Sequence, residues 1–144
     1  MLNKPEKAIE SAYLAVAGKF EECLKVKGTT PSTWRVIETL NENPGLTLKE
    51  LSQQTDIKIP ALSKLVDRLV RNALIHRKQS NVDRRSIQLF ISDHGKDTLE
   101  KCLPEVRAFR ALIADVLDSH TRVVLEKLEH IDQKSVVITP SSQE

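Results

Sequence analysis

The chain has 144 residues, with 22 Lys and Arg against 20 Asp and Glu, and a formal net charge of +2. This length favours one domain, or one domain with helical arms. A hydrophobic fraction of 40% is too high for a disordered chain of balanced charge. No apolar run approaches the roughly 18 residues of a membrane helix, and MLNKPEKAIE has no secretory signal core. We therefore expect a cytoplasmic protein that does not bind membranes.

The first two predicted elements are helices. Apolar residues recur at helical spacing from Pro5 to Lys27, and Gly28 suits the end of that helix. Thr30 is the expected N-cap of a second helix with Pro31 at its first position. The turn-forming residues 43–45 end it.

Two further helices follow in the next thirty residues. Thr47 and Glu50 have the spacing of a capping box for a short third helix. A fourth helix is predicted from about Ile59 to Asn72, with one apolar face. Its polar face carries Ser63, Lys64, Asp67, Arg68 and Arg71, of which Asp67 and Arg71 are spaced to form an ion pair.

The period then changes to that of a β-hairpin. Leu74–Gln79 and Ser86–Ser92 are predicted strands, joined by the polar residues 80–83. Ser92 is the expected cap of a long helix to about Leu117, in which Pro104 should cause a kink. A last helix carries Val124, Leu125, Leu128 and Ile131, and residues 132–144 are expected to be a loose tail.

These elements predict a mainly α fold with a small β-hairpin wing. Helix, short helix, turn, helix and hairpin in residues 30–92 follow the order of a winged helix-turn-helix. Basic residues are also concentrated in the fourth helix and the hairpin. Residues 58–85 contain eight Lys and Arg but only two acids, a net charge of +6, which leaves a charge of −4 for the rest of the chain. Such a block indicates nucleic-acid binding, although a solvated charged face is the alternative.

The sequence resembles the MarR family of bacterial transcriptional regulators. The resemblance lies in TTPSTWRVIETL, LTLKELSQQTDI and above all LVDRLVRNALIHRKQSNVDRRSIQLFISDHG. It implies an obligate homodimer that places two recognition helices in successive major grooves of double-stranded DNA, as a repressor relieved by a ligand or oxidant. The expected division is a dimerisation helix (1–29), a winged helix-turn-helix domain (30–92), dimerisation helices (93–134) and a flexible tail (135–144).

The apolar stripes of the first and last helices support a dimer independently. They lie outside residues 30–92, whose core is too small to cover three such faces, and uncovered apolar faces imply a partner. Packing of the three helices within one chain is the alternative.

Six residues are the candidate DNA-binding set. Ser63, Lys64 and Arg68 lie on the polar face of the fourth helix, where hydroxyls and cations can reach bases or phosphates. The resemblance assigns Arg85 to the minor groove, Arg84 to phosphate and Asp83 as the residue that orients Arg85. An ordinary charged helix face and turn are the alternatives. Residues 58–60 depart from the Ser- and Thr-rich pattern of the family.

An effector site is also implied by the resemblance. Trp34 matches a frequent aromatic position near a cleft of the family, with Tyr13, Phe20 and Arg35 as possible neighbours, and aromatic carboxylates are common effectors. A role in the core is equally compatible with Trp34.

Three other functions have less support in the sequence. Cys23 and Cys102 make no CxxC and lie on or near apolar stripes, which disfavours redox sensing. The four histidines show no metal-ligand spacing, and no catalytic constellation is present, so we expect no enzyme, metal or cofactor. A winged-helix module that binds proteins rather than DNA is a remaining alternative.

Overall fold

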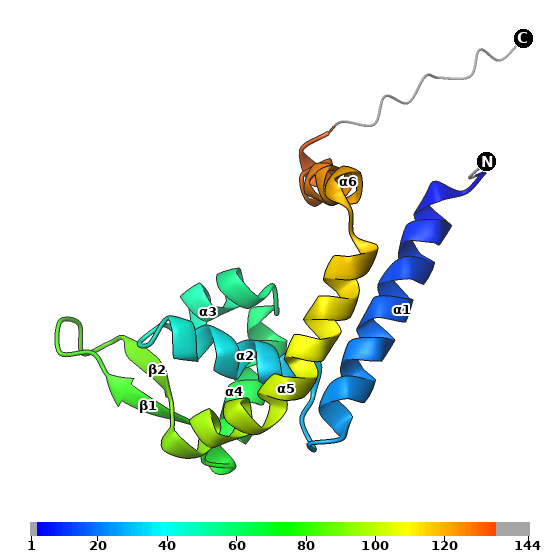
Figure 1. The fold of residues 1–144 in the computed structure, drawn as a ribbon. Helices are drawn as coiled ribbons and strands as arrows, with labels where there is room; N and C mark the ends of the chain where they lie inside the picture. Colours follow the sequence, from blue (N-terminus) through cyan, green and yellow to red (C-terminus); the bar gives the residue numbers. More distant parts are fainter. Residues whose placement is uncertain (1–2, 135–144) are drawn as a thin grey trace, which may run out of the picture. The chain divides into compact units, whose positions relative to one another are not determined.

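The computed structural model describes residues 3–134, which form helices and one hairpin (Figure 1). Mainly α structure with a small β-hairpin is confirmed. In chain order the elements are α1 (Pro5–Lys25), α2 (Pro31–Glu42), α3 (Leu48–Thr55), α4 (Ile59–Arg71), β1 (Ile75–Gln79), β2 (Ile87–Ile91), α5 (Asp93–Val116), α6 (Ser119–Glu129) and the 3-10 turn η1 (Ile131–Gln133).

The predicted helix starts are confirmed by their capping contacts. The Thr33 amide donates to Thr30 Oγ1 at 3.2 Å at the start of α2. Thr47 and Glu50 form the predicted capping box of α3. These contacts link residues three apart, so the local sequence determines them.

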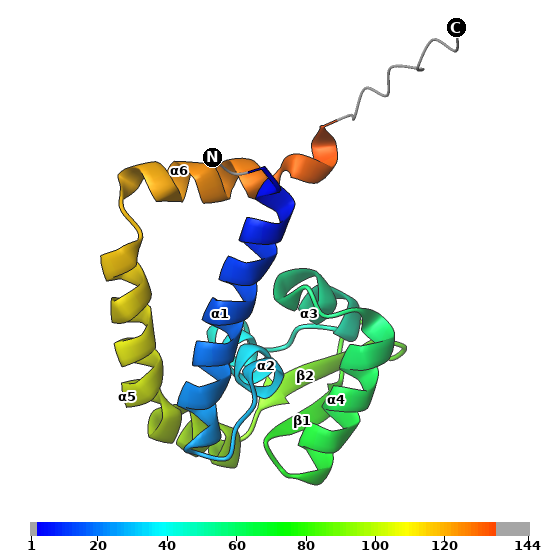
Figure 2. The same ribbon diagram turned by 90° about the vertical axis from the view of Figure 1, so that its right-hand side faces the viewer.

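Strands β1 and β2 form an antiparallel hairpin beside α4 (Figure 2). Its register pairs Ile75 with Ile91 and Gln79 with Ile87. Leu46, before α3, forms an additional antiparallel bridge with Leu89, which the sequence did not reveal. This bridge ties the hairpin to the α2–α3 connection.

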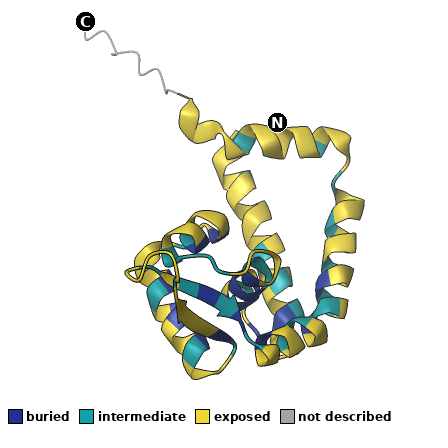
Figure 3. Ribbon diagram, turned by 90° about the vertical axis from the view of Figure 1, so that its left-hand side faces the viewer, coloured by how far each residue is buried: buried dark blue, intermediate teal, exposed yellow. Residues whose placement is uncertain are grey.

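The main core lies between the winged-helix elements. It joins buried residues of α2, α3, α4 and both strands: Val36, Ile37, Leu40, Leu51, Leu62, Leu65, Val66, Leu69, Ile75, Leu89 and Ile91. Figure 3 shows these buried positions concentrated in the helices and strands around the hairpin. Burial of one face of α4 leaves its opposite face in solvent.

A second cluster holds the C-terminal half of α1 against α2 and α5. Leu24, Trp34, Cys102 and Val106 are buried together. The Phe20 and Phe109 rings lie 4.8 Å apart between centroids. These contacts explain why the compact unit that includes the winged helix extends from the N-terminal helix to Phe109, with a second unit beginning at Arg110.

The end of the last helix differs from the prediction. The sequence predicts Ile131 in the last helix, but α6 ends at Glu129 and Ile131 begins η1. Asp132 and Gln133 therefore belong to a short turn rather than to a loose tail. Pro104 lies inside α5 as predicted. The predicted tail, residues 135–144, lies outside the described residues.

Candidate nucleic-acid interface

The outward face of α4 is cationic. Lys64 and Arg71 are exposed and lie seven residues apart, two helical turns along the same face. Arg68 is also exposed, on the edge of α4 nearer the α1–α2 connection. Ser63 lies on the opposite edge, half-buried, and lines a cavity of about 140 Å³ with Arg77 and other residues. Of the three predicted helix contacts, only Lys64 is therefore central to the outward face.

Asp67 is neutralised by the wing rather than by its own helix. Its carboxylate pairs with the guanidinium of Arg77 on β1. The Asp67–Arg71 pair belonged to the alternative of an ordinary charged helix face, and it does not form among the described residues, because folding brings β1 beside α4 and supplies another cation. Arg71 makes no ion pair with any residue in 3–134, so its charge is available for a phosphate.

The wing tip is organised by main-chain hydrogen bonds. The Asp83 carboxylate accepts from the Arg85 main-chain amide at 3.0 Å. Ser80 Oγ accepts from the amides of Val82 and Asp83 at 3.2 and 3.3 Å. Asp83 thus fixes the backbone of Arg85, whereas the prediction had it orient the side chain.

Both wing-tip guanidiniums remain in solvent. Arg84 and Arg85 are exposed, and neither has an ion-pair partner within the described residues. Lys64 and Arg71 on α4 add two more exposed cations. The two acids of this region, Asp67 and Asp83, already have partners in Arg77 and the Arg85 amide. The surface can therefore present its positive charge to a polyanion.

The departure from the family pattern at the start of α4 leaves an apolar group in solvent. Ile59 is 46% exposed and Pro60 occupies the first turn, between Lys58 and Ala61. An exposed isoleucine at the start of a recognition helix can contact a thymine methyl group.

None of the four predicted effector residues lines the cavity that holds Ser63 and Arg77. Trp34 is only 2% exposed, and its indole Nε1 donates to Glu38 Oε2 at 3.0 Å. Arg35 Nη1 donates to the Thr55 carbonyl at 3.2 Å. Phe20 packs on Phe109, while Tyr13 is 68% exposed. Trp34 is part of the core, and its assignment to an effector site stays a prediction.

The two cysteines are poorly suited to oxidation. Cys102 is buried, and its thiol contacts Thr29 Oγ1 at 3.5 Å. Burial raises the pKa of the Cys23 thiol, and the negative charge of Glu105 raises it further. A raised pKa lowers the reactive thiolate fraction at neutral pH.

Neither a candidate metal site nor a candidate membrane-spanning helix is found among the described residues. Residues 3–134 hold no group of three or more His, Cys, Asp and Glu placed to bind a metal ion. None of the helices in that range is both long and apolar enough to cross a membrane.

Comparison with known proteins identifies the scaffold. A family model described as the MarR family matches residues 27–86. The transcriptional repressor MdtR of Bacillus subtilis (strain 168) is 25% identical over 127 residues, which are 88% of this chain and 80% of MdtR. Residues 27–86 are therefore similar to the MarR family.

Solved structures show the same fold as this chain. The repressor CouR, bound to a 23-mer DNA duplex, has a TM-score of 0.76 and 24% identity, covering 93% of this chain and 98% of its own. Bordetella bronchiseptica BpsR, whose DNA binding is regulated by 6-hydroxynicotinic acid, has a TM-score of 0.79 and 16% identity, covering 94% of this chain and 97% of its own. At these identities the likeness establishes the winged-helix fold.

Proposed function

We propose that the chain is a cytoplasmic, homodimeric transcriptional repressor. Each subunit would place α4 in a major groove and the β1–β2 wing against the flanking minor groove of an inverted-repeat operator. A small-molecule effector would release the DNA. The MarR-family scaffold supports this assignment, since the relative MdtR is named as a transcriptional repressor and CouR is a repressor bound to DNA.

One observation carries the proposal: the acids beside the DNA-binding elements are engaged while the cations are free. Asp67 pairs with Arg77 and Asp83 accepts from a main-chain amide. Lys64, Arg71, Arg84 and Arg85 are exposed. Such an arrangement favours phosphate contact, and exposed guanidiniums at a wing tip suit a narrow minor groove.

The dimer is supported by apolar side chains that the chain leaves in solvent. On α1, Ile9, Tyr13, Leu14 and Val16 are 44–68% exposed. In the second unit the exposed apolar residues are Leu112, Val116, Val123, Val124, Leu125 and Ile131. Burial of such faces against a second copy is the commonest way to remove them from water.

The test of DNA binding is selection of random duplexes by the purified protein, repeated at increasing salt. Recovery of an inverted repeat with half-sites about one helical turn apart is expected. Affinity should fall steeply with salt because bound phosphates release counterions. Recovery of no sequence above background, or a flat salt response, would contradict the proposal and favour a protein-binding winged helix.

The dimer has its own test in Ile9→Glu. Charge on the exposed face of α1 should shift the protein to monomers in sedimentation. Val26→Glu is the matched control, because Val26 is 75% exposed at the end of α1 and should leave the dimer intact. An unchanged dimer in Ile9→Glu would refute the assignment of this face.

A further inference from the structure

The first turn of α4 presents only hydrocarbon side chains to solvent. Ile59 is 46% exposed, and Pro60 and Ala61, which follow it, are exposed as well. Ile57, two residues earlier, is half-buried and packs against the main core. Packing within the chain therefore accounts for Ile57 but leaves much of Ile59 open to a partner.

Two of these side chains share the face of α4 that carries Lys64. Pro60 and Ala61 precede Lys64 by four and three residues, which are the spacings of one helical face. Ser63, the nearest hydroxyl of α4, is half-buried and lines the cavity beside Arg77. The outward face therefore begins with carbon and presents its first polar side chain at Lys64.

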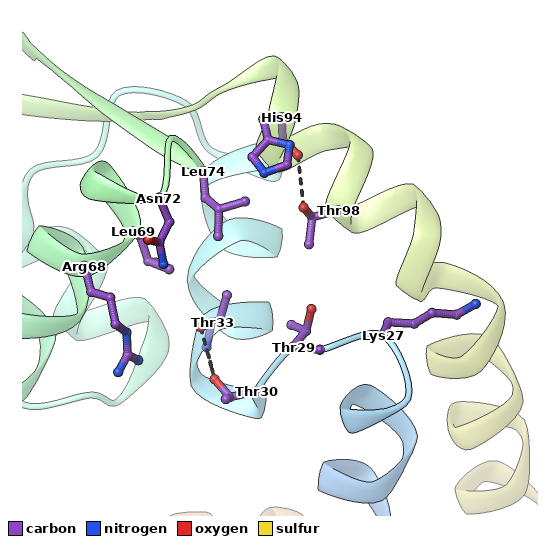
Figure 4. A pocket seen from close by; sticks show the side chains of 11 residues that line it. Lys27, Thr29, Thr30, Thr33, Arg68, Leu69, Asn72, Leu74, His94 and Thr98 are labelled. Carbon is purple, nitrogen blue, oxygen red and sulfur yellow. Dashed lines mark hydrogen bonds between the residues drawn. The ribbon is translucent and has the colours of Figure 1, made fainter.

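The other end of α4 is where further polar side chains gather. Arg68, together with Asn72 directly after the helix, borders a hollow that Thr30 and Thr33 also line (Figure 4). At a rise of 1.5 Å per residue, Arg68 lies about 10 Å along the helix from Ala61. These polar groups therefore belong to a different part of the helix from the apolar first turn.

An apolar surface of this kind discriminates between base edges. In the major groove the bases present donors, acceptors and one apolar group, the 5-methyl group of thymine. A donor or acceptor that meets hydrocarbon loses its water and gains no hydrogen bond, which costs free energy. The methyl group has no hydrogen bond to lose, and its removal from water is favourable.

We propose that the first turn of α4 reads the 5-methyl groups of pyrimidines, with Ile59 and Ala61 as the contacting side chains and Pro60 completing the apolar surface. Each operator half-site then holds a thymine at this turn. The inference rests on the proposed function, because it requires α4 to lie in a major groove. It adds the identity of a base edge, which the cations of α4 and the wing do not determine.

The test on the DNA side starts from the duplex recovered by selection. Each thymine of one half-site is replaced in turn by uracil, which lacks only the 5-methyl group. At one position at least, uracil should lower affinity about fourfold, as loss of one buried methyl group predicts. At the same position a 5-methylcytosine–guanine pair should bind more tightly than a cytosine–guanine pair.

The test on the protein side uses Ile59→Ala and Ala61→Ser. The difference between thymine and uracil at that position should disappear in at least one of them, which identifies the side chain in contact with the methyl group. The dependence of affinity on salt should stay as in the wild type, because no phosphate contact is lost. Displacement of α4 from the groove would instead reduce that dependence.

Two exposed valines provide matched controls. Val26→Ala, at the end of α1, should bind the operator as the wild type does, because Val26 lies outside the DNA-binding elements. Val82 is 99% exposed at the wing tip, which faces the minor groove in the proposed complex. Val82→Ala should therefore keep the full difference between thymine and uracil, since the methyl group projects into the major groove.

The outcomes separate this inference from the proposed function. If the chain selects an operator but binds every uracil duplex as tightly as the thymine duplex, methyl reading is wrong and the repressor assignment stands. Methyl reading by this turn is also wrong if the uracil effect persists in both Ile59→Ala and Ala61→Ser. If selection recovers no preferred duplex, the repressor assignment itself fails, and methyl reading fails with it.

Discussion

Gly95 is the position where an added methyl group should be most damaging. A Cβ atom there would lie 2.2 Å from the Leu74 carbonyl oxygen and 2.6 Å from Ile91 Cγ1. Real Cβ contacts essentially never fall under 3.0 Å, so the carbonyl would have to move by at least 0.8 Å, the difference between these distances. That carbonyl also accepts from the Ser92 amide at 3.0 Å, at the junction of β2 and α5.

The expected cost of Gly95→Ala follows from these contacts. Overpacking costs about 1–3 kcal/mol, and a strained junction hydrogen bond adds about 1 kcal/mol. The better helix propensity of alanine returns up to about 1 kcal/mol. The net loss is about 2 kcal/mol, which for a chain of this length lowers Tm by roughly 6–8 °C.

The assay is thermal unfolding at one fixed protein concentration, since a dimer's Tm depends on concentration. Gly18→Ala is the control, because a Cβ at Gly18 in α1 meets nothing within 4 Å. It should hold or raise Tm. A Gly95→Ala protein as stable as the wild type would refute the close packing of Gly95 in α5 against the Leu74 carbonyl, which directly precedes β1.

Three further changes test the interface and the caps. Arg85→Ala should weaken operator binding and reduce the salt slope by about one, whereas Arg107→Ala, an exposed arginine of α5, should leave both unchanged in the same anisotropy titration. Asp67→Asn should free Arg77 and strengthen binding to random duplexes more than to the operator, with less than about 1 kcal/mol change in stability because the pair is exposed; a competition assay showing unchanged discrimination would contradict this. Hydrogen bonds from Thr47 lower the pKa of Glu50 below its ordinary 4.5. The contribution of Glu50 to stability is therefore present above pH 4.5 and is lost as the pH falls through the lower pKa of the folded state. Glu50→Gln should flatten this acid decline in denaturant unfolding, and a pH profile identical to that of the wild type would refute the linkage.

The features that the sequence predicted correctly are those set by near neighbours. Thr30 caps α2 because its hydroxyl reaches an amide three residues on, and Thr47 with Glu50 does the same for α3. The alternation of β2 and the periodicity of α4 likewise depend on local spacing. Fold class and element order follow from such signals.

The features that it missed depend on contacts between distant segments. Arg77 became the partner of Asp67 only because β1 lies beside α4, while the helical spacing had favoured Arg71. Leu46 bridges Leu89 across 43 positions. Gly95 had a signal only through the family's Ser/Thr-x-x-Gly step into the long helix, and its physical role comes from the approach of the Leu74 carbonyl.

The burial of Trp34 has a consequence for how an effector would act. Because its indole is enclosed and bonded to Glu38, an effector that stacks on Trp34 would first have to open the cluster with Leu24, Cys102 and Val106.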